Sequence, residues 1–263
     1  MKFDKIERLD IKSRNSLFAG YVGKNKFFIK RYVFRKGMEK EDLLKARCEI
    51  LCYRNLKSMN LPRVVEADYR KRLLVLDFVR YRDVVASKKT VDGILDLRSR
   101  VMKGIDASFL PKVTYAYYSS NLHRQAMELK DRKIIKDLNG IFDQFEESKI
   151  ALNESARYFS HGDLRFGNIK YLGQRLTIID MEHSRRDNLM CDLAGIYADL
   201  SDKKALADYF MNRITKMKEF DGDLFTLMLY RRCIEILHAL KGTPASSHYK
   251  KAKELIETIS PDK

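Results

Sequence analysis

The sequence contains little of what breaks or cross-links a chain. Its 263 residues include four prolines, 12 glycines, four cysteines and no tryptophan. So few prolines and glycines exclude a collagen-like or proline-rich chain. Four cysteines at this length do not make a disulfide scaffold, so we expect reduced thiols and a cytoplasmic protein. No run approaches the roughly 20 apolar residues that a membrane-spanning helix needs, and none is expected.

Positive charge, in contrast, is in clear excess. Lys and Arg number 52 against 36 Asp and Glu, which gives a formal net charge of +16, and hydrophobic residues make up 45%. That apolar content is enough for a folded chain. The many charges are typical of thermophilic proteins, but ion-pair networks need both signs. The excess of one sign therefore favours a polyanionic partner, held partly by counterion release.

Hydrophobic periodicity divides the chain into a strand-rich first part and a helix-rich remainder. Strands are predicted over 16–22, 26–33, 64–67, 73–79, 169–172 and 176–180. Helices are predicted over 39–60, 91–103, 122–148, 153–158, 191–200, 204–216, 223–240 and 246–258. This order is typical of an α+β protein. We expect two lobes, 1–80 and 81–263, and a cleft between two lobes is a common ligand site.

One segment carries recognisable chemistry: residues 159–169, Phe-Ser-His-Gly-Asp-Leu-Arg-Phe-Gly-Asn-Ile, followed by a hairpin whose second strand ends in Asp180. Phosphoryl transfer needs a carboxylate that accepts the proton of the attacking hydroxyl, and hard oxygen ligands for Mg²⁺. Asp163 fits the first role. Asn168 and Asp180 fit the second, because each offers an oxygen at the mouth of the same hairpin. Arg165 can neutralise charge on the transferred phosphoryl group.

This set resembles the eukaryotic-type kinase superfamily, most closely its aminoglycoside phosphotransferase and choline kinase branch. Members of the branch carry His-Gly-Asp, as at 161–163 here, and a strand ending in Ile-Asp that is often followed by Glu, as at 179–182. Asp192-Leu-Ala matches a later Asp that starts a helix and braces the catalytic loop; His161 is expected to brace it too. The resemblance implies a protein-kinase-like bilobal fold, with a small antiparallel sheet and one long helix in the first lobe and a larger, mainly helical second lobe.

The same resemblance assigns roles in the first lobe and beside the metal. Lys30, on a strand, matches the family lysine that contacts the nucleotide's phosphates. Glu49 on the following helix matches its ion-pair partner, and Glu41 is the alternative. Glu182 either assists the metal or faces water.

The nucleotide-binding hinge and phosphate loop are implied in the same way. The hinge whose backbone meets adenine corresponds to residues 76–79, which include Asp77 and Val79. A Gly-rich phosphate loop is missing, and residues 12–16 stand in its place. Aminoglycoside kinases often have Ser and Asn there, so Asn15 and Ser16 are the expected phosphate contacts. The implied cofactors are Mg²⁺ and ATP, with GTP as an alternative donor.

The acceptor must be inferred from composition. The basic clusters are Arg80/Arg82, Lys88/Lys89, Arg98/Arg100, Arg185/Arg186, Arg231/Arg232 and Lys250/Lys251. With Tyr115, Tyr117 and Tyr118, expected in a loop, they suit phosphate contacts and base stacking. A polycationic aminoglycoside would instead favour carboxylates. We therefore expect an RNA kinase that phosphorylates a ribose 2′-hydroxyl of tRNA, similar in size, basicity and composition to archaeal tRNA kinases.

Three alternatives remain. A small-molecule or glycolipid sugar kinase also fits, because lipid-A-type substrates are anionic. A protein Ser/Thr kinase fits less well, because the eleven residues between Asp180 and Asp192 are few for a peptide-docking activation segment. A non-catalytic binding module is disfavoured, because the candidate catalytic set is intact.

Overall fold

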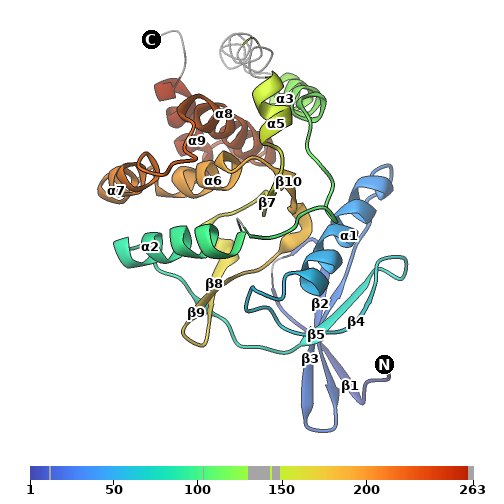
Figure 1. The fold of residues 1–263 in the computed structure, drawn as a ribbon. Coiled ribbons are helices and arrows are strands. Elements are labelled where there is room, and N and C mark those ends of the chain that lie inside the picture. The colour runs from blue at the N-terminus through green and yellow to red at the C-terminus, as the bar shows by residue number, and fades with distance from the viewer. Residues whose placement is uncertain (12, 103, 130–142, 144–148, 260–263) are drawn as a thin grey trace. The chain divides into compact units, whose positions relative to one another are not determined.

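The computed structural model describes the whole chain except residues 12, 103, 130–142, 144–148 and 260–263 (Figure 1). It divides into two compact units, each built from two stretches of chain. Unit 1 comprises Met1–Val84 and Gly167–Ser184, and unit 2 comprises Val85–Phe166 and Arg185–Lys263. Residues 167–184 thus group with the first part of the chain. The lobe boundaries inferred from sequence stay a prediction.

Unit 1 is built on a five-stranded antiparallel sheet with the order β1-β2-β3-β5-β4. The strands are β1 (Lys5–Arg8), β2 (Ser16–Val22), β3 (Asn25–Arg31), β4 (Val64–Asp68) and β5 (Leu73–Asp77). The predicted hairpin is β2 and β3, joined at Gly23, whose φ of 57° favours glycine. Helix α1 (Glu39–Asn55) packs Ala46 and Ile50 against the sheet residues Leu74 and Leu76. The predicted antiparallel sheet with one long helix is confirmed.

A second, three-stranded sheet in unit 1 supports the metal-binding candidates. It has the order β6-β8-β9 and contains β6 (Arg82–Asp83), β8 (Ile169–Leu172) and β9 (Arg175–Ile178). A 3₁₀ turn, η2 (Phe166–Asn168), precedes β8, and another, η3 (Met181–His183), follows β9 and packs against α1. Both ends of the β8–β9 hairpin therefore lead directly into candidate site residues.

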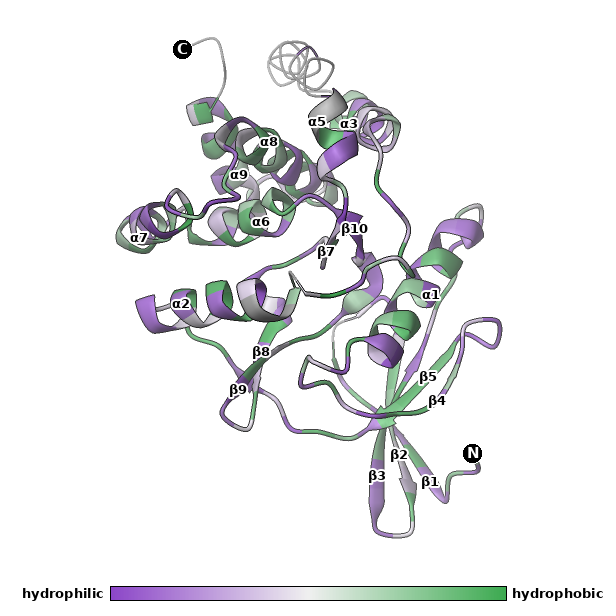
Figure 2. Cartoon of the chain, viewed as in Figure 1, coloured by the Kyte–Doolittle hydropathy of each residue, from purple (hydrophilic) through white to green (hydrophobic). Residues whose placement is uncertain are grey.

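Unit 2 is mainly helical. Its helices are α2 (Lys88–Leu97), the π turn η1 (Arg98–Met102), α3 (Tyr115–Leu129), α5 (Lys149–Ser155), α6 (Met190–Leu200), α7 (Lys204–Ile214), α8 (Gly222–Ala239) and α9 (Ser247–Ile259). Strands β7 (Tyr158–Ser160) and β10 (Arg185–Asp187) pair antiparallel. Helices α6 and α8 pack together and α9 covers α8. Figure 2 shows that α6 is largely hydrophobic, as expected for a helix in a core.

One local prediction is wrong. The expected loop containing the three tyrosines is the first turn of α3, which also begins earlier than the predicted helix 122–148. Tyr115, Tyr118, Leu122 and Ala126 are all buried, at the three- and four-residue spacing of a helix face. Burial of this face outweighs the weak helix propensity of tyrosine. The part of the predicted helix beyond Leu129 lies almost wholly outside the described residues.

The remaining expectations concern membranes and thiols. None of the helices that the structure describes has the length and apolarity needed to cross a membrane. Cys48, Cys52, Cys191 and Cys233 are all buried free thiols.

Candidate active site

A buried ion pair lies at the centre of unit 1. Lys30 sits on the face of β3 that also carries Phe28, and α1 covers that face, because alternate strand residues point to the same side. The Lys30 Nζ lies 2.7 Å from a carboxylate oxygen of Glu49 on α1. Both residues are buried, with 6% and 2% of their surface exposed. Tyr32 donates a 2.9 Å hydrogen bond to the same Glu49 oxygen. The structure thus pairs the predicted lysine with Glu49 rather than Glu41, which pairs with Lys45.

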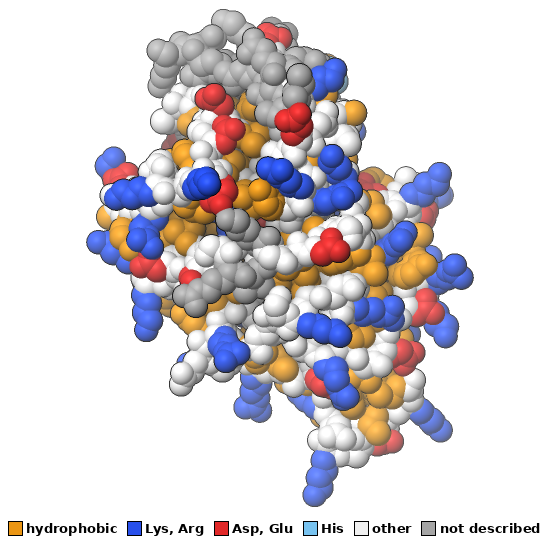
Figure 3. All heavy atoms as spheres, in the orientation of Figure 1, with side chains coloured by type: hydrophobic (Ala, Val, Ile, Leu, Met, Phe, Trp, Pro, Cys, Tyr) orange, Lys and Arg blue, Asp and Glu red, His pale blue; other side chains and the backbone are white. Residues whose placement is uncertain are grey.

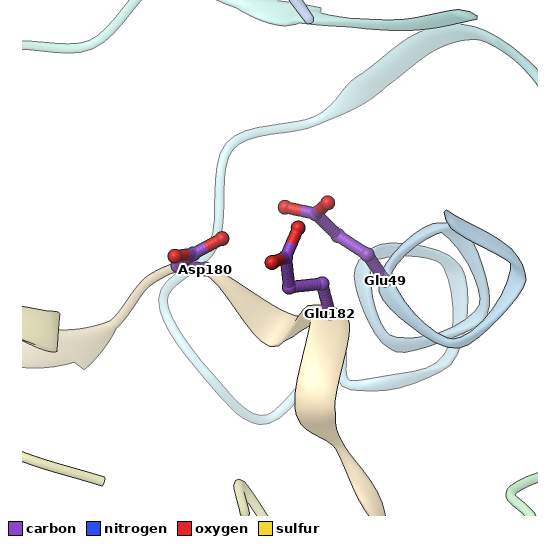
Figure 4. Close-up of side chains that lie close together, drawn as sticks. All are labelled: Glu49, Asp180 and Glu182. Carbon is purple, nitrogen blue, oxygen red and sulfur yellow. The ribbon is translucent and has the colours of Figure 1, made fainter. Parts of the chain in front are cut away.

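Two further carboxylates approach the same ammonium group. Lys30 donates a 3.1 Å hydrogen bond to Asp180 and lies 3.5 Å from Glu182. Burial alone would lower the pKa of Lys30, but these carboxylates, with Glu49 the strongest, raise it. Lys30, Glu49, Asp180 and Glu182 are called the Lys30 cluster below, and Figure 4 shows its three carboxylates.

Asp180 is held in an unusual backbone conformation. Its φ of 63° and ψ of 59° lie in the left-handed region, which Asp tolerates better than most residues. Such conformations gather at functional sites. The Ile179 N–H donates to the Asn168 carbonyl at 2.9 Å, so Asn168 and Asp180 lie at the same end of the β8–β9 hairpin. This is the placement that the sequence predicted for two metal ligands.

The carboxylates of Glu49, Asp180 and Glu182 could hold a divalent cation. One oxygen from each lies within 4.8 Å of the others, and oxygen ligands are what Mg²⁺ prefers. Glu49 is already shared by Lys30 and Tyr32, whereas the Asp180 side chain is 42% exposed. Asp180 is therefore the most available ligand of the three.

The loop that replaces a Gly-rich loop is tied to this cluster. Asn15 accepts a 3.2 Å hydrogen bond from the Val33 N–H and donates one of 3.2 Å to Glu182. Arg14 lies 3.4 Å from Glu182 and 3.4 Å from the buried Asp42 of α1. Burial alone would raise the pKa of Glu182, but hydrogen bonding to His183 and the nearby cations lower it well below its usual range. Lys12 lies outside the described residues.

The other predicted nucleotide contacts lie at strand ends. Ser16 begins β2 and pairs with Arg31. Asp77 ends β5, its N–H donates to the Arg63 carbonyl at 3.0 Å, and its carboxylate lies 3.1 Å from Arg63. Val79 follows two residues later. The contacts of these residues with a nucleotide stay predictions.

In unit 2, the predicted catalytic loop is braced by Asp192 of α6. The backbone N–H groups of His161 and Gly162 donate to its carboxylate at 2.9 and 3.0 Å, and Ser160 donates through its hydroxyl at 3.0 Å. Gly162 has a φ of 78°, in the left-handed region that favours glycine. The loop that presents Asp163 is thus fixed by the helix that the sequence predicted to brace it. His161 is fully buried, and its Nδ1 accepts a 3.3 Å hydrogen bond from the Asp163 N–H.

Close packing holds the same loop from another side. A Cβ at Gly195 of α6 would lie 2.4 Å from the Leu164 carbonyl oxygen, so only glycine allows this approach. The Phe166 N–H donates to Asp199 at 2.8 Å. The loop is therefore preorganised at both ends, as a positioned base requires.

Two guanidinium groups flank the Asp163 carboxylate. Arg232 of α8 lies 2.7 Å from Oδ1, and Arg165 lies 3.4 Å from Oδ2. Arg232 also lies 3.6 Å from Glu235, one turn further along α8. These four residues are called the Asp163 cluster below. Burial alone would lower the pKa of Arg232, but Asp163 and then Glu235 raise it.

Sequence reasoning missed Arg232 as a partner of Asp163. It counted Arg232 in a surface cluster with Arg231. The available signal was a group of three charged residues, Arg231, Arg232 and Glu235, in the middle of the mainly apolar helix 223–240. Charges in such a helix are paired or functional.

Three arginines of the predicted basic surface are buried, so that part of the prediction is wrong. Arg98, Arg185 and Arg231 are exposed by 3%, 7% and 4%. They bind the Leu189 carbonyl, Asp187 and Glu235, respectively. Tyr118 is buried too, and its hydroxyl donates to Asp187. These side chains are part of the core, and their charges and hydroxyls are paired because an unpaired polar group is costly to bury.

On the face drawn in Figure 3, the exposed charges of both signs are mixed. Among the described residues drawn in Figure 3, Lys and Arg are scattered over the visible face with Asp and Glu between them. The picture therefore does not single out one basic patch.

Comparison with solved structures gives matches over almost the whole chain. Choline kinase LicA from Streptococcus pneumoniae matches with a TM-score of 0.73 and 15% identity, over 98% of this chain and 94% of that one. The chain has the fold of choline kinases and aminoglycoside phosphotransferases. Aminoglycoside phosphotransferase APH(4)-Ia matches with a TM-score of 0.69 and 13% identity, over 98% and 94%. Spectinomycin phosphotransferase APH(9)-Ia, bound to ADP and spectinomycin, matches with 0.59 and 12%, over 100% and 91%.

These matches confirm the predicted fold class and the resemblance at the level of the fold. No family model and no curated protein matches the sequence. With identities this low, the acceptor must be argued from the residues of this chain.

Proposed function

We propose that the protein is an ATP-dependent phosphotransferase that moves the γ-phosphoryl group to a hydroxyl. The observation that carries the proposal is the buried Lys30–Glu49 ion pair beside Asp180. Burying charged side chains costs free energy unless the charges are paired, and removing one partner of a buried pair strongly destabilises the fold. On a fold whose solved neighbours include complexes with ADP or AMP, this network supports a nucleotide site.

In the proposed reaction, Lys30 binds the nucleotide's phosphates and Glu49 fixes its position. Asp180, Asn168 and Glu182 would hold Mg²⁺, whose chemistry is to neutralise charge on the phosphates and orient them. The excess of carboxylate in the Lys30 cluster fits a divalent cation. The hinge residues Asp77 and Val79 and the loop residues Asn15 and Ser16 are proposed to contact the nucleotide, with GTP as an alternative donor.

Asp163 is proposed to act as the base. The acceptor oxygen forms a bond to the γ-phosphorus while the bond to the β,γ-bridging oxygen breaks, and its electron pair leaves with ADP. The acceptor's proton passes to the Asp163 carboxylate. Arg165 neutralises charge that develops on the transferred group, since guanidinium binds such oxygens strongly.

For the acceptor, a small molecule or a glycolipid sugar is the better-supported class. The structural neighbours are named for choline and aminoglycosides, which are small hydroxyl compounds. A tRNA 2′-hydroxyl is the second candidate, supported by the net charge of +16. The burial of Arg98, Arg185, Arg231 and Tyr118 removes part of the argument for RNA.

The test is a transfer assay across acceptor classes. The protein is incubated with Mg²⁺ and γ-labelled ATP or GTP, together with choline, sugars, detergent-solubilised glycolipid, total tRNA or a protein substrate. We expect ADP formation and labelling in one small-molecule arm. Asp163→Asn should lower turnover by about 10²- to 10⁴-fold, while calorimetry shows largely retained ADP binding. The exposed Asp208→Asn on α7 is the matched control. Absence of both nucleotide binding and transfer in every arm would disprove the proposal.

A further inference from the structure

The Asp163 cluster has an arrangement that the proposed reaction does not by itself require. A base needs an accessible carboxylate oxygen, yet both Asp163 oxygens are approached by guanidinium groups. Arg232 comes from α8, outside the catalytic loop, and its contact of 2.7 Å is the shorter of the two. A guanidinium at this distance makes a carboxylate a weaker base, because it stabilises the charged form. Arg232 must therefore contribute something else if Asp163 is the base.

The side chains linked to Asp163 through ion pairs carry more positive than negative charge. Glu235, the nearest other carboxylate on α8, lies 2.7 Å from Arg231 and 3.6 Å from Arg232, so it is shared between two arginines. Arg165 is half exposed and adds a third guanidinium. Three guanidinium groups thus face two carboxylates. An anion that enters here meets uncompensated positive charge in a partly buried setting, where such interactions are strong.

The hydrogen-bonding capacity of Arg232 is also unfilled. Its side chain is 16% exposed, and its Nε is buried without a hydrogen-bond partner within the described part of the chain. Buried donors are rarely left unsatisfied, and each one costs free energy. Arginine presents five donors in a planar fork that matches the oxygens of a phosphate. The group next to the base is therefore suited to bind an anion while it remains close to Asp163.

We infer that the acceptor carries a phosphate group next to the hydroxyl that is phosphorylated, and that Arg232, assisted by Arg165, binds this phosphate. The inference rests on the proposed function, with Asp163 as the base. A hydroxyl and a phosphate on neighbouring carbons match a carboxylate and a guanidinium that are themselves in contact. When the phosphate draws Arg232 toward itself, the hold on Asp163 weakens and the carboxylate becomes a better base. A cationic acceptor such as choline would be repelled at the same place.

Two sources supply this chemistry. In RNA, a ribose 2′-hydroxyl lies next to a 3′-phosphodiester. In a phosphorylated sugar, whether free or part of a glycolipid, a ring hydroxyl lies next to the phosphate-bearing carbon. Both present the same pair of groups to Arg232 and Asp163.

Matched acceptor pairs test the inference on the wild-type protein. The first pair is uridine and uridine 3′-monophosphate, and the second is glucose and glucose 1-phosphate; choline is the cationic acceptor. We expect kcat/KM to be at least about tenfold higher for the phosphate-bearing member of one pair, which corresponds to one strong charge-assisted hydrogen bond. A preference in the uridine pair, extended to tRNA, points to RNA, and a preference in the glucose pair points to sugar phosphates. Equal use of both members, preference for choline, or nucleotide binding without transfer to either phosphate-bearing acceptor overturns the inference.

Variants at Arg232 separate a specificity role from a structural one. Arg232→Gln should raise KM for the phosphate-bearing acceptor, so that the ratio of kcat/KM values within an acceptor pair falls toward 1. Arg232→Lys should retain part of the preference for the phosphate-bearing acceptor because the charge remains. Inorganic sulfate should compete with the acceptor in the wild type and lose potency in Arg232→Gln. Arg213→Gln, on the exposed face of α7, is the control. An unchanged preference in Arg232→Gln contradicts the inference. If that variant fails to fold, the comparison of acceptor pairs with the wild-type protein decides the question by itself.

This test distinguishes the inference from the proposed function. If the protein binds no nucleotide and consumes no ATP or GTP with any acceptor, the proposed function fails. If nucleotide is bound and consumed but phosphate on the acceptor makes no difference, only the inference fails.

Discussion

The two clusters differ in charge. In the Lys30 cluster, one buried ammonium group is surrounded by the carboxylates of Glu49, Asp180 and Glu182. In the Asp163 cluster, two guanidinium groups meet the carboxylates of Asp163 and Glu235, and the neighbouring Arg231 adds a third guanidinium. Both are held by elements that pack in the core of their own unit, α1 against the sheet in unit 1 and α6 against α8 in unit 2.

The difference indicates which partner each cluster lacks. An excess of carboxylate oxygens suits a divalent cation, and an excess of guanidinium groups suits an anion. A Mg²⁺–nucleotide supplies the cation, and a phosphate-bearing acceptor supplies the anion. If the comparison is correct, removing a charge from either cluster should have effects of predictable sign.

The largest effect is expected from Lys30→Met. Removal of the ammonium leaves three carboxylates close together, two of them largely buried, and we expect a loss of about 3 kcal/mol or more in the free energy of unfolding. The double variant Lys30→Met/Glu49→Gln should recover part of this loss, because the most buried uncompensated carboxylate is then neutral. Urea unfolding of the wild type, Lys30→Met, Glu49→Gln and the double variant measures the coupling.

Lys170→Met is the control for loss of a surface cation. Lys170 on β8 pairs at 2.6 Å with Asp83 on β6, whose side chain is exposed. Ion pairs with an exposed partner contribute less than about 1 kcal/mol to the free energy of unfolding. If Lys30→Met proves no more destabilising than Lys170→Met, the Lys30 cluster is not the buried charge network described above.

A smaller effect is expected from Asp180→Asn. Asn also tolerates the left-handed backbone at this position, so the change removes charge while it preserves geometry. We expect the Mg²⁺ concentration for half-maximal turnover to rise about tenfold or more, because a carboxylate ligand binds a hard cation better than an amide does. The surface variant Asp83→Asn should leave the Mg²⁺ dependence unchanged. Equal Mg²⁺ dependence in wild type and Asp180→Asn would remove Asp180 from the metal site.

What the sequence could predict was local in the chain. The hairpin that carries Lys30 follows from strand periodicity and a glycine turn, and the motif from Asp163 to Asp180 is contained in one short stretch. The bracing by Asp192 could be anticipated because the kinase branch that the sequence resembles carries this Asp in its motif. Each of these features depends on neighbours within a few dozen residues.

What the sequence could not predict depends on tertiary burial. Arg232 reaches Asp163 from α8, and no periodicity relates these two positions. Arg185 and Arg231 read as surface charges because most arginines are exposed, but both are buried and paired. The sequence likewise predicts a loop at Tyr118, because the burial of the α3 face that Tyr118 shares with Leu122 is a tertiary feature.

The smallest expected effect concerns the pH dependence of Glu182. Its pKa in the folded protein lies below the usual value of 4.5. The ionised group therefore stabilises the fold fully above pH 4.5, and this contribution is lost as the pH falls below that value toward the folded pKa. Glu182→Gln should be less stable than the wild type by about 1 to 2 kcal/mol at pH 7, and the difference should shrink by pH 3.

Urea unfolding of nucleotide-free protein in EDTA at both pH values isolates this effect from metal binding. Glu66→Gln on β4 is the control, because Glu66 pairs only with the exposed amino terminus among the described residues. A difference that stays constant between pH 7 and pH 3 would mean that Glu182 acts through its shape and not its charge. The Lys30 cluster would then hold one carboxylate fewer than the comparison requires, and its affinity for a divalent cation would rest on Asp180 and Asn168.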